Sequence, residues 1–219
     1  MGQSWMIERL HSATRVLHVD ADADFDLLFR EDTQHADYLV FLTRQYGFEA
    51  PLEAAFAMTP NLDLMIDLYA RQKASLIAQD LLALDVAPID LSSLPLCLRV
   101  PQFRGAAEAL GWMYVIERAT LAHAVIRRHL TTRLPKAMRE ASAYLQAYSG
   151  MVGTRWREFG NVLDDVARHP AIADRVTEAA LEAFRVQRRW ARSDSPRLPS
   201  RPPPAEIDSS EWPTIPESD

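Results

Sequence analysis

The longest uninterrupted helical pattern in the chain runs from Leu110 to Leu130 and reads LGWMYVIERATLAHAVIRRHL. Side chains three and four residues apart share one side of an α-helix. One such side is almost wholly apolar, and its members are Trp112, Ile116, Ala119, His123, Ile126 and Leu130. An apolar stripe of this length must be buried against other elements. We therefore expect a central helix in which His123 is either a hydrogen-bonded core residue or a ligand.

The rest of the chain predicts further helices and no strand of convincing length. We expect the acidic run Asp20–Asp24 to end the first helix, and Gly47 and Pro51 to interrupt the second before the chain becomes helical again. The charged side chains of segment 63–84 should face outward, and residues 85–101 should form a loop that holds Cys97. The pattern predicts an all-α fold, a single domain of about seven or eight helices. Helical spacing recurs over residues 4–18, 35–46, 63–84, 139–148, 154–169 and 171–192.

Composition and charge narrow the class of protein. Of the 219 residues, 48% are hydrophobic and 25% are charged, which is enough apolar material for a core. The single cysteine allows no internal disulfide and indicates a reducing compartment. No apolar run approaches the roughly 18 residues that span a bilayer, and the N-terminus lacks the apolar core of a signal peptide. We expect a cytoplasmic protein that does not bind membranes.

The last part of the chain differs from the rest. Residues 194–219 hold six acids and two arginines, so they supply −4 of the net charge of −6 and leave −2 to residues 1–193. That balance does not indicate a nucleic-acid partner. Seven of the fourteen prolines lie in the last 24 residues. We expect a helical domain over residues 1–193 and a disordered tail over 194–219.

The chain contains none of the motifs HExxH, GxGxxG, GxSxG, P-loop or paired CxxC. Its notable chemistry is a set of histidines on apolar helical faces. His11 and His18 share one face of the first predicted helix, and His123 lies on the central one. Buried neutral imidazoles can ligate a metal or heme iron, although most buried histidines are core residues.

Several segments resemble the bacterial heme oxygenases that produce biliverdin, of the type found with bacteriophytochromes. The resemblance begins with ERLHSATRVLH at 8–18 and YLVFLTRQYGFEAPLEAAF at 38–56. In that family the first helix carries the pattern LRxATxxxH, whose final histidine is the proximal iron ligand; residues 10–18 here read LHSATRVLH. The resemblance covers about residues 5–192, in the same order and with similar gaps. It continues through 71–84, 93–97, 109–130, 156–164 and 179–190.

The resemblance implies a heme site and a reaction. His18 would be the proximal iron ligand, with His11 as its competitor one helical repeat earlier. Arg157 would pair with a heme propionate, and Phe184 would pack against the macrocycle. The alternatives are that Arg157 faces solvent and that Phe184 is an ordinary core residue. Heme would be both cofactor and substrate, cleaved to biliverdin, CO and iron. The implied partners are a reductase or ferredoxin-type electron donor and a bacteriophytochrome that accepts biliverdin.

The chain departs from the family at its central helix. Family members usually read EGSxLGG there, and the glycines let the helix backbone approach heme. Residues 117–123 of this chain read ERATLAH. Arg118, Ala122 and His123 replace the three glycines, and Ala119 stands where the family has a serine or acid that organises distal water. These four are the candidate catalytic positions.

Three functions therefore stay open at the level of sequence. The first is an active heme oxygenase with an altered distal pocket. The second is a noncatalytic heme binder or sensor in which His18 and His123 ligate iron from opposite faces. The third is a heme-free interaction protein of the same fold. A related helical fold serves thiamin-degrading enzymes with a cysteine nucleophile, but Cys97 has no evident base beside it.

Overall fold

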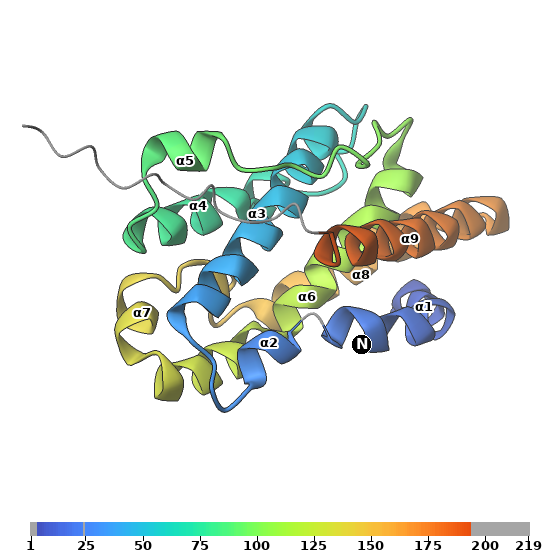
Figure 1. The fold of residues 1–219 in the computed structure, drawn as a ribbon. Coiled ribbons are helices and arrows are strands. Elements are labelled where there is room, and N and C mark those ends of the chain that lie inside the picture. Colours follow the sequence, from blue (N-terminus) through green and yellow to red (C-terminus); the bar gives the residue numbers. More distant parts are fainter. Residues whose placement is uncertain (1–3, 24, 194–219) are drawn as a thin grey trace, which may run out of the picture.

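The computed structural model describes residues 4–23 and 25–193, and it contains no strand over that range (Figure 1). This confirms the all-α prediction. The described residues form nine α-helices rather than seven or eight, because three helices of four to six residues escape a periodicity argument. The predicted tail, 194–219, lies outside the described residues. The helices are α1 (Trp5–Ala23), α2 (Asp26–Phe29), α3 (His35–Ala57), α4 (Ala74–Ala83), α5 (Pro88–Ser92), α6 (Ala106–Arg133), α7 (Pro135–Glu140), α8 (Val152–Val166) and α9 (Pro170–Ala191), with 3₁₀ turns η1 (Tyr69–Arg71) and η2 (Tyr144–Gln146).

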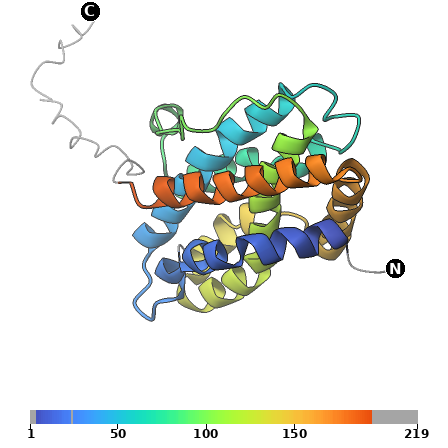
Figure 2. The same ribbon diagram turned by 90° about the vertical axis from the view of Figure 1, so that its right-hand side faces the viewer.

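Helix α6 runs through the middle of the molecule, as predicted, and the whole apolar stripe from Trp112 to Leu130 is buried. On one side, α9 and α1 lie next to each other and cross α6, and α8 completes that layer (Figure 2). On the other side lie α3, α4 and the segment from α7 to η2 (Figure 1). Helix α6 contributes to two clusters of buried apolar side chains. Its first half, up to Ile116, packs with α1, α8, α9 and the second half of α3, whereas its second half packs with α2, α4, η2 and the first half of α3. The two halves of α6 therefore lie in different apolar surroundings.

Helix α3 continues through Gly47 and Pro51, where we expected an interruption. A proline inside a helix cannot bond the carbonyl four residues earlier, which here belongs to Gly47. That carbonyl instead accepts a hydrogen bond from the Cys97 backbone N–H at 2.8 Å. Glycine is required because a Cβ at position 47 would lie 2.4 Å from the Trp190 ring. The break predicted from sequence is thus repaired by a partner from a distant segment.

The long helix predicted over 63–84 is wrong in its first half. Only α4, from Ala74, is helical, and the chain before it forms turns. Arg71 and Lys73 are buried rather than outward-facing, and Asp80 of α4 is buried as well. The Glu53 carboxylate accepts hydrogen bonds from the backbone N–H groups of Lys73 and Ala74, at 2.6 and 2.9 Å. This contact from α3 starts the helix at Ala74.

Two other predicted boundaries differ from the structure. Helix α1 continues to Ala23, because aspartate lowers helix propensity only slightly. The helix predicted over 139–148 does not form, since α7 ends at Glu140 and only the short turn η2 follows. The Asp80 carboxylate accepts hydrogen bonds from the N–H groups of Ala143 and Tyr144, at 2.8 and 2.9 Å. These bonds hold the backbone in a turn.

Candidate functional site

His18 lies on the face of α1 that is turned toward α6 and α9. Its side chain is buried, as the apolar face of the first predicted helix implied. The centre of its ring lies 5.2 Å from that of Phe184 on α9 and 6.4 Å from that of Tyr114 on α6. The exposed residue His11 lies on the outer side, 5.1 Å away between ring centres. The structure thus brings together His18, His11 and Phe184 of the predicted set.

The hydroxyl of Thr14 links His18 to α6. Thr14 Oγ1 lies 2.7 Å from His18 Nε2 and donates a hydrogen bond to the Leu10 carbonyl at 2.7 Å. Thr14 also lies near the Tyr114 hydroxyl on α6. Burial raises the pKa of Tyr114, and Thr14 and the charge of Arg118 offset part of that rise. Our sequence reasoning did not single out Thr14 or Tyr114, although the spacing of Thr14 and His18, one helical turn apart, indicated a contact.

Beyond Tyr114, one stripe of α6 faces the same way and is partly open to solvent. It consists of Arg118, Leu121, Ala122 and Val125, which recur at spacings of three and four. Arg118 and Ala122 are half-buried, and Leu121 and Val125 are 45% and 54% exposed. We call these four residues the open stripe. Two large apolar side chains so exposed on a central helix offer a surface to a flat apolar ligand.

The remaining predicted residues lie apart from this group. Arg157 on α8 is exposed, and its guanidinium donates to the Thr154 hydroxyl at 3.3 Å. Its neighbour Trp156 does reach the group, with its ring centre 5.9 Å from that of Tyr114. Ala119 is buried among apolar side chains of α2, α3, α4 and η2, against which Ala122 of the open stripe also packs.

His123 faces away from His18. It follows Tyr114 by nine residues, which is about two and a half helical turns and places it on the opposite side of α6. Its ring packs against Tyr144 at 4.5 Å between centres, and neither nitrogen has a well-aligned hydrogen-bond partner among the described residues. Burial and the charge of Lys73 lower the pKa of His123 to about 3, and the nearby Tyr144 backbone offsets little of this. The structure does not bring His18 and His123 together as a pair of ligands.

The side of α6 that holds His123 also holds a buried cluster of charges, which sequence reasoning missed. Lys73 donates to Glu117 at 3.1 Å and lies 3.8 Å from Glu49. Arg71 is paired with the other oxygen of Glu117. Tyr144 donates to Glu49 at 2.5 Å. We call these five residues, together with Tyr148, which donates to Glu117 at 2.9 Å, the charged cluster.

The cluster shifts the protonation of its members. Burial raises the pKa of Glu49 to about 7, although Lys73 and Tyr144 both act in the opposite direction. Burial lowers the pKa of Lys73, but the charges of Glu117 and Glu49 outweigh that effect and raise it. Lys73 is fully buried and Glu117 nearly so, and no described contact joins the cluster to His18. We therefore assign the charged cluster a structural role: its paired buried charges hold α6 in place.

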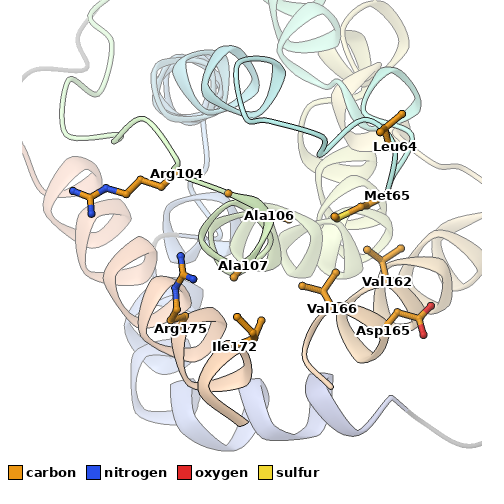
Figure 3. A pocket seen from close by; sticks show the side chains of 11 residues that line it. Leu64, Met65, Arg104, Ala106, Ala107, Val162, Asp165, Val166, Ile172 and Arg175 are labelled. Carbon is orange, nitrogen blue, oxygen red and sulfur yellow. The ribbon is translucent and has the colours of Figure 1, made fainter. Parts of the chain in front are cut away.

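A cleft of about 710 Å³ opens elsewhere, between the starts of α6 and α9 and the end of α8 (Figure 3). Figure 3 shows Val162, Val166 and Ile172 on its walls, with Arg104 and Arg175 beside it. None of the predicted site residues lines it. In the part of the chain that the structure describes, no group of three His, Cys, Asp or Glu residues could hold a metal ion. No helix within the described residues is long and apolar enough to cross a membrane.

Comparisons with known proteins show the family and the fold. Residues 4–193 match the family model described as heme oxygenase. The fold is similar to that of the heme oxygenase from Neisseria meningitidis, in structures with NO and CO bound, with a TM-score of 0.67 and 22% sequence identity. That similarity covers 85% of this chain and 90% of the other. No curated protein matches the sequence.

Proposed function

Because the chain belongs to the heme oxygenase family, we propose that it binds heme at the face of α6 turned toward α1 and oxidises it to biliverdin, CO and iron. The observation that carries this proposal is the buried imidazole of His18, set among aromatic rings at one end of the open stripe. Imidazole is a common axial ligand of heme iron, and a flat apolar group needs apolar walls. Both requirements are met by residues of α1, α6 and α9.

Each residue of this face has a role in the proposal. His18 would ligate the iron, and Phe184 and Tyr114 would pack beside it. Ala122, Leu121 and Val125 would cover the opposite face of the ligand and exclude water from it. Heme would supply the iron that activates dioxygen and also the carbon skeleton that is oxidised. The electrons would come from a reductase or ferredoxin-type donor, and a bacteriophytochrome would accept the product.

The lost glycines bear on the approach of α6 to the ligand. Ala122 adds only a methyl group, so the backbone can still come close at that position. His123 replaces the glycine next to that position, but its side chain points to the far side of α6 and adds no bulk to the open stripe. Arg118 is the one large side chain added near Tyr114, and its charge favours the Tyr114 phenolate. Of the three residues that replace glycines, only Arg118 therefore adds a large side chain to this face of α6.

Hemin titration of the purified protein tests the proposal, with His18→Ala and His11→Ala as a matched pair. Wild type and His11→Ala should give the Soret band of an imidazole-bound ferric heme, and His18→Ala should lose it unless imidazole is added. If His11→Ala loses the band and His18→Ala keeps it, the ligand has been assigned to the wrong histidine. If no variant binds hemin, a heme-free interaction protein is the better description.

A single-turnover reaction separates an oxygenase from a noncatalytic binder. Hemin-loaded protein with ascorbate should lose its Soret band and release a pigment that absorbs in the red, as biliverdin does. If wild type binds hemin but gives no bile pigment, and Arg118→Gly gives it, the chain is a binder whose chemistry is blocked at Arg118. If both wild type and Arg118→Gly give pigment, the chain is an active heme oxygenase.

A further inference from the structure

The proposed function makes no use of the cleft between the starts of α6 and α9 and the end of α8 (Figure 3). Its volume of about 710 Å³ is in the size range of ligand pockets. Val162, Val166 and Ile172 form its walls. Leu64 and Met65, from the segment between α3 and η1, lie at its edge and are 80% and 44% exposed. An open cleft with so much exposed apolar surface indicates a binding site.

The rim of the cleft favours negative charge. Arg104 and Arg175 lie on one side of it, and the starts of α6 and α9, where helices carry partial positive charge, border it as well. Two carboxylates nearby are already paired. Glu108 accepts a hydrogen bond from the Arg104 backbone N–H at 2.8 Å and pairs with Arg175 at 3.0 Å. Asp165 is paired with Arg168. Three arginines against two carboxylates suit an occupant that combines apolar groups with acids.

The end of this same sequence has that composition. Residues 206–219 read EIDSSEWPTIPESD, with five acids and no basic residue. Three large apolar residues stand among the acids, namely Ile207, Trp212 and Ile215. We call residues 206–219 the acidic segment. Its chemistry complements both the apolar walls and the basic rim of the cleft.

The acidic segment is connected closely enough to reach the cleft. Helix α9 has 22 residues and is therefore about 33 Å long, with the cleft at its start and the rest of the chain leaving from its end. The 18 residues from 194 to 211 can span at most about 60 Å, so Trp212 can reach the cleft without the movement of any helix. A tether of this kind gives an effective concentration in the millimolar range, so even weak docking is populated.

We propose that the acidic segment docks in this cleft of its own chain, with Trp212 and Ile215 against the apolar walls and the neighbouring acids beside Arg104 and Arg175. Docking covers the exposed side chains at the edge of the cleft. Any other partner can then enter only after the acidic segment has left. The inference does not depend on heme binding.

Fluorine NMR of the full chain labelled with 5-fluorotryptophan tests the proposal, and Trp212→Phe identifies the Trp212 signal. In wild type that signal should lie away from its position in urea. Leu64→Asp places a negative charge at the exposed edge of the cleft and should return the signal to the urea position. Ile89→Asp is the matched control, because Ile89 is 74% exposed on α5 and does not line the cleft. Unchanged signals of the buried Trp112 would show that each variant is folded.

A second pair of variants tests the charges at the rim. Arg175→Glu should lower the ratio of docked to free segment by about 2- to 5-fold, which is the range for an exposed ion pair. Arg128→Glu is the matched control, since Arg128 is exposed near the other end of α6. High salt should move the Trp212 signal of wild type in the same direction as Arg175→Glu does.

The outcomes are distinct. A Trp212 signal that Leu64→Asp and Arg175→Glu return toward the urea position, while both controls leave it in place, supports docking. A wild-type signal already at the urea position overturns the proposal and leaves the cleft to another partner. A displaced signal that neither cleft variant moves also overturns it, because the segment then docks elsewhere. A signal that depends on protein concentration would assign the occupant to a second copy of the chain and overturn docking within one chain.

Discussion

The two sides of α6 are built by opposite means. Toward α3 and α4, the helix is fixed by the charged cluster, in which Glu117 holds both Arg71 and Lys73 beneath the surface. Toward α1, it carries the partly exposed open stripe, and its Tyr114 packs against the rings of His18, Trp156 and Phe184. Buried charges tolerate little displacement, because each must keep its partner or its hydration, whereas aromatic contacts can slide. The contrast places the rigid anchor on one side of α6 and the adaptable surface on the other.

This difference has a functional meaning. A ligand that enters between α1 and α6 must displace side chains, and the loss of aromatic and apolar contacts costs less than the loss of buried ion pairs. The anchor on the far side keeps α6 in place while that happens. The experiments below disturb one side and ask whether the other responds, beginning with the largest expected effect.

Lys73→Met should produce the largest loss of stability. The side chain is 0% exposed and lies between the carboxylates of Glu49 and Glu117. Its removal leaves buried negative charge without its cation, which typically destabilises a protein by about 3–5 kcal/mol. Urea unfolding followed by circular dichroism measures this. Hemin affinity of the folded fraction should change little, since no described contact links Lys73 to His18.

Two further variants control that experiment. Arg168→Met breaks an exposed ion pair with Asp165, in which the arginine side chain is 78% exposed, and should change stability by less than about 1 kcal/mol. Glu49→Gln added to Lys73→Met removes one of the uncompensated charges and should restore part of the loss. A Lys73→Met protein as stable as wild type would show that the charged cluster is not the anchor of α6.

Glu49 and His123, both on the side of α6 that holds the charged cluster, should make the stability of the protein depend on pH in opposite directions. The pKa of Glu49 is raised from 4.5 to about 7, so the folded state holds a proton that the unfolded state lacks, and stability falls as pH rises from about 4.5 to 7. The pKa of His123 is lowered from 6.5 to about 3, so stability falls as pH drops from about 6.5 to 3. Between about pH 4.5 and 6.5 the two trends oppose each other.

Single substitutions should separate these trends. Subtracting the Glu49→Gln curve from that of wild type should leave a contribution that falls with rising pH. The same subtraction with His123→Phe should leave one that rises. Thermal or urea unfolding at pH 4, 5, 6, 7 and 8 gives the curves. Two parallel difference curves would mean that these side chains are not buried in the states described.

The sequence predicted the elements that have a local signal. The stripe from Trp112 to Leu130 follows the helical period, and all of it is buried. The buried side of α1 with His18 was visible in the same way, but the prediction was wrong for His11, which was placed on the same apolar face and is exposed. Resemblance then supplied the role of His18, because periodicity alone cannot separate a ligand from a core histidine. It also brought Phe184 into the set, and Phe184 does lie beside His18.

The missed features depend on partners that are distant in sequence. Arg71 and Lys73 look like surface residues of an amphipathic helix until Glu117, 46 and 44 positions away, is placed beside them. Pro51 looks like a break until Cys97 bonds the carbonyl that it leaves free. His123 shows the limit most clearly. The stripe indicated that it is buried, but only the packing of α6 shows that it faces Tyr144 rather than α1.

The smallest effect should come from the rim of the adaptable side. Arg157 is exposed and its guanidinium is bonded to the Thr154 hydroxyl, while Trp156 beside it reaches Tyr114. If Arg157 turns to a propionate, Arg157→Glu replaces an attraction by a repulsion and weakens hemin binding. Charge-assisted bonds span about 1–3 kcal/mol, and solvent screening at this exposed site favours the lower end, about a 5-fold rise in Kd. Hemin titrations at low and high salt measure it, since screening should shrink the difference.

Arg168→Glu is the control for charge alone, because it makes the same reversal just past the other end of α8. Equal effects of both variants would assign the change to the net charge of the protein, and no effect of either would leave Arg157 as a surface residue.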